Sequence, residues 1–333
     1  MLKASVLVVS RTPALLNRLL HSLDLAYSGD ADSIEIIASW NGSRSDEMLA
    51  RGGRLPFAII QHDPYHFASN MNDLARKARG EVLIFANDDL IIDPGGIDAA
   101  LERLETQPEV GIVGARLRTS DGQLAHAGIH FTSSGSPYHQ LEHFADANHP
   151  TNTRERMVPA VTGAFFAMRR DDFLTLELAE TFQVCGEDVL LSLQTRSLLN
   201  KQVLYCPAMS GIHDAESTRS QFDEQQGNDD DMKRMRAGWH ELIQRAKQES
   251  LLVELRAVQD EAEDLRDYCL KLQDSGKQQS VMIEELKSQT ARQTQLQADQ
   301  TRQTLELSIV EGENKRLRSR LQQLENQLNA TKR

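Results

Sequence analysis

Residues 82–89 read VLIFANDD, and this stretch indicates the fold. A short apolar run followed directly by carboxylates is typical of a buried strand with functional side chains beyond its carboxyl end. Other short runs with strand character and the helical stretches between them occur in alternation at residues 5–9, 14–23, 34–38, 57–60, 70–78, 97–104 and 111–115. Because strands that alternate with helices form a mostly parallel sheet covered on both faces, the sequence predicts an α/β domain.

The charge of the chain narrows the class of ligand. The 333 residues carry a formal net charge of −12. This charge disfavours a nucleic-acid-binding protein, which needs a basic surface. It does not exclude phosphate ligands, because a bound divalent cation can supply the positive charge locally.

Cysteine usage and hydropathy indicate the compartment. The three cysteines form no CxxC pair, which favours a reduced cytosolic environment. The first apolar run is too short for a signal peptide, and no stretch approaches the roughly 18 to 20 apolar residues of a membrane span. We expect a cytoplasmic protein without a transmembrane segment, with any attachment to the inner membrane peripheral.

The second half of the α/β domain is less regular. The run at residues 158–168 predicts a buried strand, and residues 187–199 predict a helix. A short strand at 202–205 and a turn at Pro207 are expected to follow.

The last quarter of the chain predicts a coiled coil. Beyond residue 240 there is no proline, and Tyr268 is the only aromatic residue. Apolar side chains recur there at alternating steps of four and three, at Leu251, Leu255, Val258, Ala262, Leu265, Cys269 and Leu272, and again between 307 and 328. Such heptads need a partner helix, so we expect a parallel homo-oligomer, with a different helical partner or a membrane-associated assembly as the alternatives. A long solvated helix or a disordered tail would also explain the composition.

These patterns divide the chain into three parts. We expect the α/β domain at residues 1–225, a helical junction at 226–245 and the coiled-coil tail at 246–333.

Two acidic pairs are candidates for chemistry. Asp88 and Asp89 follow the strand at 82–85, and adjacent carboxylates there suit Mg²⁺ or Mn²⁺, although a turn that caps the next helix explains them equally well. Glu187 and Asp188 open a helix, where one of them could serve as a general base. Acidic residues in a first helical turn also simply complement the helix dipole.

A third cluster follows the predicted strand at 202–205. It contains His213, and Ser217 and Arg219 nearby add donors suited to a phosphate. A lone histidine is more often structural than a ligand. We expect His126 and His130 to be structural as well.

In their shared order these segments resemble the family 2 glycosyltransferases with the GT-A fold, especially the rhamnosyltransferase-like bacterial group. The resemblance covers residues 4–219 and rests on five stretches, namely the approach at 78–89, the glycines at 111–114, the run DGQLAHAGI at 121–129, the strand with VTGA at 161–164, and GEDV at 186–189. The sequence departs from the pattern at Trp40, where many members carry an acidic residue, and at Asn87, where they carry Asp.

The resemblance implies a role for each candidate. Asp89 would be the principal ligand of Mn²⁺ or Mg²⁺, Asp88 would touch the metal or the ribose, and His213 would contact the metal or the diphosphate. Asp188 would be the catalytic base, with Glu187 orienting the acceptor. The side chains expected near the nucleotide are Asn41, Asp63 and Asn70, although turn formation and helix capping explain Asp63 and Asn70 too.

The function that follows is inverting transfer of a sugar from a nucleoside diphosphate to a hydroxyl of a glycan or another cell-surface acceptor. Two alternatives remain open. One is a non-catalytic scaffold, in which a decayed transferase domain sits on a coiled-coil stalk. The other is a nucleotidyltransferase, for which the early sequence around Arg11 lacks a glycine-rich phosphate loop.

Overall fold

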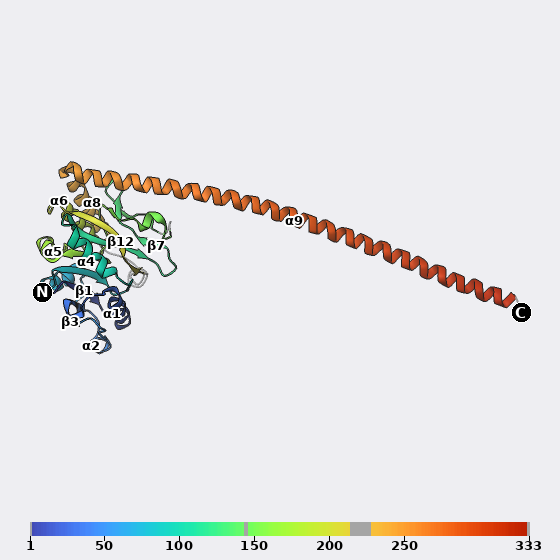
Figure 1. Ribbon diagram of the computed structural model, residues 1–333, viewed down its shortest axis with the longest axis horizontal. Coiled ribbons are helices and arrows are strands. Elements are labelled where there is room, and N and C mark those ends of the chain that lie inside the picture. Colours follow the sequence, from blue (N-terminus) through green and yellow to red (C-terminus); the bar gives the residue numbers. More distant parts are fainter. Residues whose placement is uncertain (1, 143–145, 214–227, 332–333) are drawn as a thin grey trace. The chain divides into compact units, whose positions relative to one another are not determined.

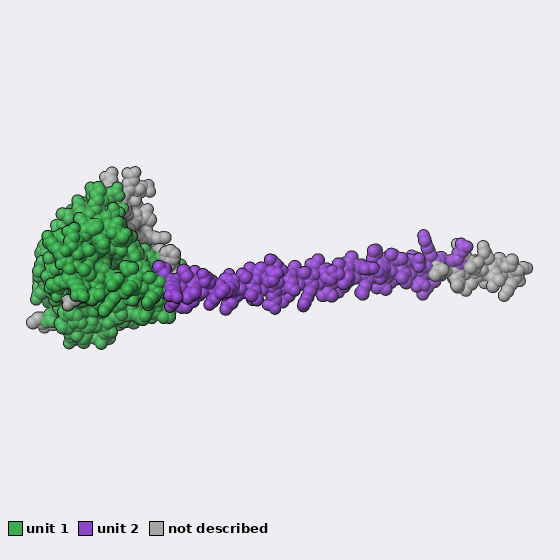
Figure 2. All heavy atoms as spheres, turned by 90° about the horizontal axis from the view of Figure 1, so that it is seen from above, with its two compact units in different colours: residues 1–264 green, residues 265–333 purple. Residues whose placement is uncertain are grey.

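The structure is a computed structural model that describes residues 2–142, 146–213 and 228–331. It divides into two compact units, Met1–Asp264 and Leu265–Arg333, which Figure 2 shows in different colours. The first unit contains the sheet and its helices (Figure 1). The second consists of the greater part of one long helix.

The elements of the first half alternate as the sequence predicts. In chain order they are β1 (Ala4–Ser10), α1 (Pro13–Ala26), η1 (Ala31–Ser33), β2 (Ile34–Trp40), α2 (Arg44–Glu47), β3 (Phe57–Gln61), α3 (Phe67–Lys77), β4 (Val82–Asn87), β5 (Leu90–Ile92), α4 (Gly96–Thr106) and β6 (Val110–Arg118).

The second half has short strands first and helices later. Its elements are β7 (Leu124–His126), β8 (Ile129–Phe131), β9 (Pro137–His139), η2 (Pro150–Thr153), β10 (Arg156–Met157), β11 (Phe165–Arg169), α5 (Arg170–Leu176), α6 (Glu187–Ser197), β12 (Gln202–His213), α8 (Asn228–Arg245) and α9 (Gln248–Thr331).

The central sheet is mixed, with a parallel part formed by β1, β2, β3 and β4. Its strand order is β10-β12-β6-β11-β4-β1-β2-β3, with β5 beside β12 and β7 beside β6. The pairs β1–β2, β1–β4, β2–β3 and β6–β12 are parallel, whereas β11 runs antiparallel between β4 and β6. Parallel strands end at the same edge, so the carboxyl ends of β1 to β4 lie together.

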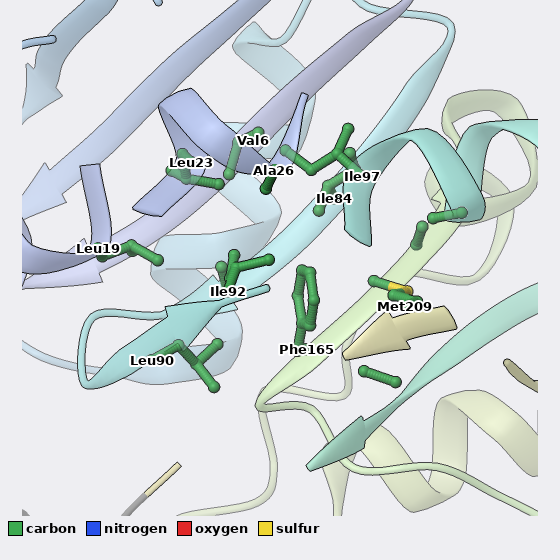
Figure 3. Packing of buried hydrophobic residues seen from close by; sticks show 14 of the residues in the cluster. Val6, Leu19, Leu23, Ala26, Ile84, Leu90, Ile92, Ile97, Phe165 and Met209 are labelled. Atoms are coloured by element: carbon green, nitrogen blue, oxygen red, sulfur yellow. The ribbon is translucent and has the colours of Figure 1, made fainter. Parts of the chain in front are cut away.

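Two cores cover the two faces of this sheet. In β1, Val6 packs with the apolar side of α1 and α4, whereas its neighbour Leu7 packs with α3. This alternation follows from the period of two along a strand. Figure 3 shows the first core, in which Leu19 and Leu23 of α1 gather with Ile97 of α4. The α/β architecture expected from the sequence is confirmed.

Two strands differ from the expectation. The run at 158–168 becomes a strand only at β11, because Pro159 has no amide hydrogen to donate and residues 163 and 164 form a turn. Conversely, β12 continues past Pro207 to His213. Its register shifts between Cys206 and Ser210, and such a bulge is where a strand tolerates proline.

Helices α8 and α9 follow the sheet. Helix α8 packs on α6 through Met235 and Leu242. Helix α9 is continuous from Gln248 to Thr331, and its residues up to Asp264 belong to the first unit. Among the described residues, no helix combines the length and apolar character that a membrane crossing requires.

Candidate functional site

Asp88 lies just past the end of β4 and is held by β1. The Ser10 hydroxyl donates to Asp88 Oδ2 at 2.6 Å. Burial raises the pKa of Asp88 from 3.8 to about 6, and the neighbouring charge of Asp89 adds to this, although the Ser10 hydrogen bond opposes it. The site therefore holds a carboxylate whose charge burial disfavours.

Asp89 is brought to His213 by the pairing of β5 with β12. In that antiparallel ladder, Leu90 lies opposite His213, which puts the preceding aspartate beside the imidazole. His213 Nε2 is 3.2 Å from Asp89 Oδ1, and both side chains are largely buried. Arg18 of α1 donates to the Asp89 carbonyl oxygen at 3.1 Å. Two candidates 124 positions apart in the sequence thus form a pair.

Asp188 opens α6 and is held by backbone donors on both oxygens. Gly163 N donates to Asp188 Oδ2, and Val189 N donates to Oδ1 at 2.7 Å. Gly186, with a φ of 113°, precedes the helix in a conformation that suits glycine. Glu187 and Asp188 are both half-buried, so the pair is open on one side.

The segment at 161–164, which immediately precedes β11, links the two acidic pairs. Asn87 N donates to the Ala164 carbonyl oxygen at 2.9 Å, and Gly163 immediately precedes Ala164 in the chain. Because Gly163 N donates to Asp188, two adjacent residues make the contact with the end of β4 and the contact with the start of α6. Asp89 and His213 are thus in contact, and Asp188 is linked to the end of β4 through residues 163 and 164, whereas the convergence of all four side chains on one ligand stays a prediction.

Two histidines to which the sequence analysis gave no functional role, His126 and His139, support the segment at 161–164. Thr162 N donates to His126 Nε2 at 3.4 Å, and His126 Nδ1 lies 3.0 Å from His139 Nδ1. Burial lowers the pKa of His126 well below its usual value, with further contributions from His139 and His213. A neutral His126 can accept at Nε2 and donate at Nδ1, as both contacts require. No spacing in the sequence pairs these two histidines.

The candidates near the nucleotide lie beyond β2 and β3. Asn41 N donates to the Ser10 carbonyl oxygen at 2.8 Å, and its side-chain amide donates to the Asp63 carbonyl oxygen. Asn41 Oδ1 is buried and has no hydrogen-bond partner among the described residues. A buried acceptor of this kind is costly unless something donates to it. Asn41 therefore stays a candidate for contact with a ligand.

Asn70 and Trp40 have structural duties. Asn70 Oδ1 accepts from His66 N at 3.0 Å and its amide donates to Pro64 O at 3.3 Å, which closes the loop before α3. Trp40 is buried in the first core, and its indole donates to the Ser43 carbonyl oxygen at 2.9 Å. Packing, rather than stacking on a base, describes the observed Trp40.

Arg219 and Ser217, which were expected to donate hydrogen bonds to a phosphate, lie outside the described residues.

The site offers two side chains that could bind a divalent cation, Asp89 and His213. Within residues 2–142, 146–213 and 228–331, no group of three or more histidine, cysteine or acidic side chains could hold a metal by itself. Asp89 and His213 nevertheless supply an oxygen and a nitrogen donor next to the buried Asp88. Mg²⁺ in particular is usually bound by one or two carboxylates together with water and substrate phosphates. The residues fit a cation that binds together with a phosphorylated ligand.

Residues 6–175 match the sequence model of the family described as "Glycosyl transferase family 2". The chain is also similar to "O-antigen biosynthesis protein RfbC" of Myxococcus xanthus, with 32% identity over 169 residues. That match covers 47% of this chain and only 13% of the relative.

Two solved structures are similar to this chain at low sequence identity. The structure of "GalNAc-T7 with UDP, GalNAc and Mn2+" gives a TM-score of 0.49 at 16% identity and covers 64% of this chain and 44% of that one. The mannosyltransferase PcManGT from Pyrobaculum calidifontis, in complex with GDP-Man and Mn2+, gives 0.48 at 12% identity and covers 82% and 79%. Both TM-scores lie below 0.5, which is too low to transfer a substrate.

Proposed function

Because this chain belongs to family 2 of the glycosyltransferases and has the GT-A fold followed by a long helix, we propose that it transfers a sugar from a nucleoside diphosphate to a hydroxyl group, with inversion at the anomeric carbon. Two observations support the proposal: Asp89 contacts His213, and the carboxylate Asp188 is bound by Gly163, whose neighbour Ala164 is hydrogen-bonded to Asn87 at the end of β4.

The acidic side of the site would hold the donor. Asp89 and His213 would bind Mn²⁺ or Mg²⁺, with Asp88 touching the cation or the ribose. When bound, such a cation supplies Lewis-acid stabilisation to the negative charge that develops on the leaving diphosphate. The buried Asn41 Oδ1 would accept from the nucleoside, with Asp63 beside it. Asn70 would act through the loop that it closes, and Arg219 would contact phosphate.

The helical side would hold the acceptor. Asp188 keeps both carboxylate oxygens in fixed positions through Gly163 N and Val189 N, and each oxygen retains a further lone pair. One of these lone pairs would take the proton of the incoming hydroxyl as it attacks the anomeric carbon. Attack on the face opposite the diphosphate gives inversion, and Glu187 would orient the acceptor.

The acceptor class comes from the relative in Myxococcus xanthus, whose name refers to O-antigen biosynthesis. We propose that the acceptor is a glycan or another cell-surface molecule. We also propose that the protein is cytoplasmic, with at most peripheral attachment at the inner membrane. A cytoplasmic site would give the enzyme direct access to nucleotide sugars.

The test is a panel of nucleotide sugars incubated with the chain and Mn²⁺. Release of the nucleoside diphosphate identifies the donor, and NMR of the transferred sugar gives its anomeric configuration. We expect release with a restricted set of donors and an inverted product. Retention of configuration would overturn the inverting mechanism. If no donor in the panel is bound or cleaved, the chain is a scaffold with a decayed domain.

The tail would join copies of the chain. The expected seam is exposed throughout its described part, with Leu255 and Val258 each 52% exposed and Leu272 55% exposed. Leucines repeated at heptad spacing are unstable in water without a partner. We propose a parallel homo-oligomer through the expected tail at 246–333, with the catalytic part at 1–225 and the junction at 226–245.

Light scattering on the full chain tests the tail. We expect a mass of two or more chains. Replacing Leu265 and Leu272 with Lys would place charges in the seam and should return the mass to that of one chain. A monomeric wild-type chain would exclude self-association and leave another helical partner.

A further inference from the structure

The first turns of α9 pack against the rest of the first unit through a polar face, and their apolar face is exposed. Ala257, Glu261 and Asp264 are 5%, 9% and 7% exposed, whereas Leu251 and Leu255 on the adjacent face are 41% and 52% exposed. A surface helix normally buries its apolar stripe. Polar contacts must therefore specify how this helix is held.

The first of these contacts reaches α6. Arg196 donates to Glu254 Oε1 at 2.6 Å, to the Ser250 carbonyl oxygen at 3.0 Å and to the Pro159 carbonyl oxygen at 3.1 Å. Its side chain is 1% exposed. A buried guanidinium that loses its carboxylate is strongly unfavourable, so the pair is held tightly. Arg196 lies in the last turn of α6, and Asp188 lies in the first turn of the same helix.

The second contact reaches the β8–β9 hairpin. Glu261 Oε2 lies 2.9 Å from His130 Nδ1 and accepts from the Tyr138 hydroxyl at 2.6 Å. His130 stands on β8 and Tyr138 on β9, so one carboxylate ties both strands together. Burial raises the pKa of Glu261, but the hydrogen bonds from His130 and Tyr138 outweigh it, and the net shift is downward.

The β8–β9 hairpin is also connected to Asp188 through a chain of hydrogen bonds. His139, which follows Tyr138 on β9, contacts His126, and His126 accepts from Thr162 N. The next residue, Gly163, donates its backbone N–H to Asp188. The buried face of α9 thus contacts α6, which carries Asp188, and it also supports Gly163, which donates its backbone N–H to Asp188.

We propose that Glu254 and Glu261 are positioning residues for Asp188. The start of the tail helix is then part of the support of the active site as well as the base of a stalk. The inference rests on the proposed function in that Asp188 is taken as the catalytic base. Thr151, which donates to Asp264 Oδ1 at 2.9 Å, adds a third contact on the same face.

The experiment uses the full chain with Glu254→Gln and Glu261→Gln. Each substitution keeps the size of the side chain and removes the charge that holds the partner. Because small displacements of a reacting group can reduce rates by about 10²-fold, we expect each variant to lower kcat on the order of ten-fold or more. The KM for the donor should stay unchanged, since the donor side of the site is untouched.

Two matched controls separate positioning from stability. Glu263→Gln changes an exposed carboxylate on the same helix and should leave kcat at the wild-type value. Glu35→Gln removes the charge of a buried carboxylate that binds Arg79 at the amino end of β2, and it should lower the melting temperature without changing kcat. If Glu254→Gln and Glu261→Gln behave as Glu35→Gln does, the inference is wrong.

A second readout does not depend on turnover. Hydrogen–deuterium exchange of the backbone over residues 159–165 reports whether the Gly163 N–H is held. We expect faster exchange in Glu254→Gln and Glu261→Gln and no change in either control. Unchanged exchange in all variants overturns the positioning role. Faster exchange in a chain that cleaves no donor would sustain the structural link and reject the proposed function instead.

Discussion

The two acidic pairs of the site look alike in the sequence and differ in their surroundings. Asp88 and Asp89 lie at the end of a buried strand, where the nearest partners are Ser10 and His213. Asp188, beside Glu187, is half-buried and receives two backbone N–H groups. Like charges in a buried position call for a cation, whereas a carboxylate oriented by backbone donors can receive a proton. The proposed difference in role between the two pairs therefore follows from the neighbours of each pair rather than from residue type.

The most severe test of this contrast is Asp188→Asn. The amide cannot accept the hydroxyl proton as a base does, so the transfer rate should fall by about 10²- to 10⁴-fold. Donor affinity, measured by calorimetry, should remain that of the wild type. Turnover close to the wild-type rate would show that another group is the base.

Asp89→Asn, in the other pair, should weaken the binding of the cation as well as lower the activity. The variant loses the charged oxygen beside His213, and we expect activity to fall on the order of 10²-fold together with a weaker affinity for Mn²⁺. Calorimetric titration of Mn²⁺ in the presence of a nucleoside diphosphate measures the affinity. Asp98→Asn, an acidic residue in the first turn of α4, is the control and should change neither quantity.

Asp88 predicts a pH dependence of stability. Its pKa in the folded protein, about 6, lies above the ordinary 3.8, so protonation favours the folded state. Without a divalent cation, this stabilisation is complete below pH 3.8 and disappears as the pH rises through 6. The difference corresponds to on the order of 3 kcal/mol at most. Melting temperatures of wild type and Asp88→Asn between pH 4 and 7 should converge at low pH, where a constant offset would contradict the prediction.

Glu187→Gln should have the smallest effect of the four. If this residue only orients the acceptor, its loss should lower activity by about ten-fold or less and raise the KM for the acceptor. A loss as large as that of Asp188→Asn would mean that the two residues share the role of base.

The first half of the fold and the acidic pairs could be predicted because they depend on local patterns. Runs such as 82–85 alternate with helices, and carboxylates after strand ends gather at one edge. The pairing of His213 with Asp89 depends on the ladder between β5 and β12, and β12 reaches His213 only because Pro207 sits in a bulge. That register is tertiary information.

The docking of α9 was harder still to predict. A heptad pattern draws attention to the apolar residues such as Leu255, yet the helix attaches through Glu254 and Glu261 on another face. Their partners Arg196 and His130 lie 58 and 131 positions away. Nothing in the spacing of charged residues distinguishes these contacts from an ordinary solvated helix surface.

Gly163 also offers a diagnostic for relatives of this chain. A Cβ atom there would stand 3.1 Å from the Cβ of Asp188 and 3.2 Å from its Oδ2, closer than side-chain atoms normally approach. A larger residue would press directly on the aspartate. A genome survey could therefore sort copies that keep the aspartate but have replaced this glycine, and mark them as candidates for lost turnover before any enzyme is purified.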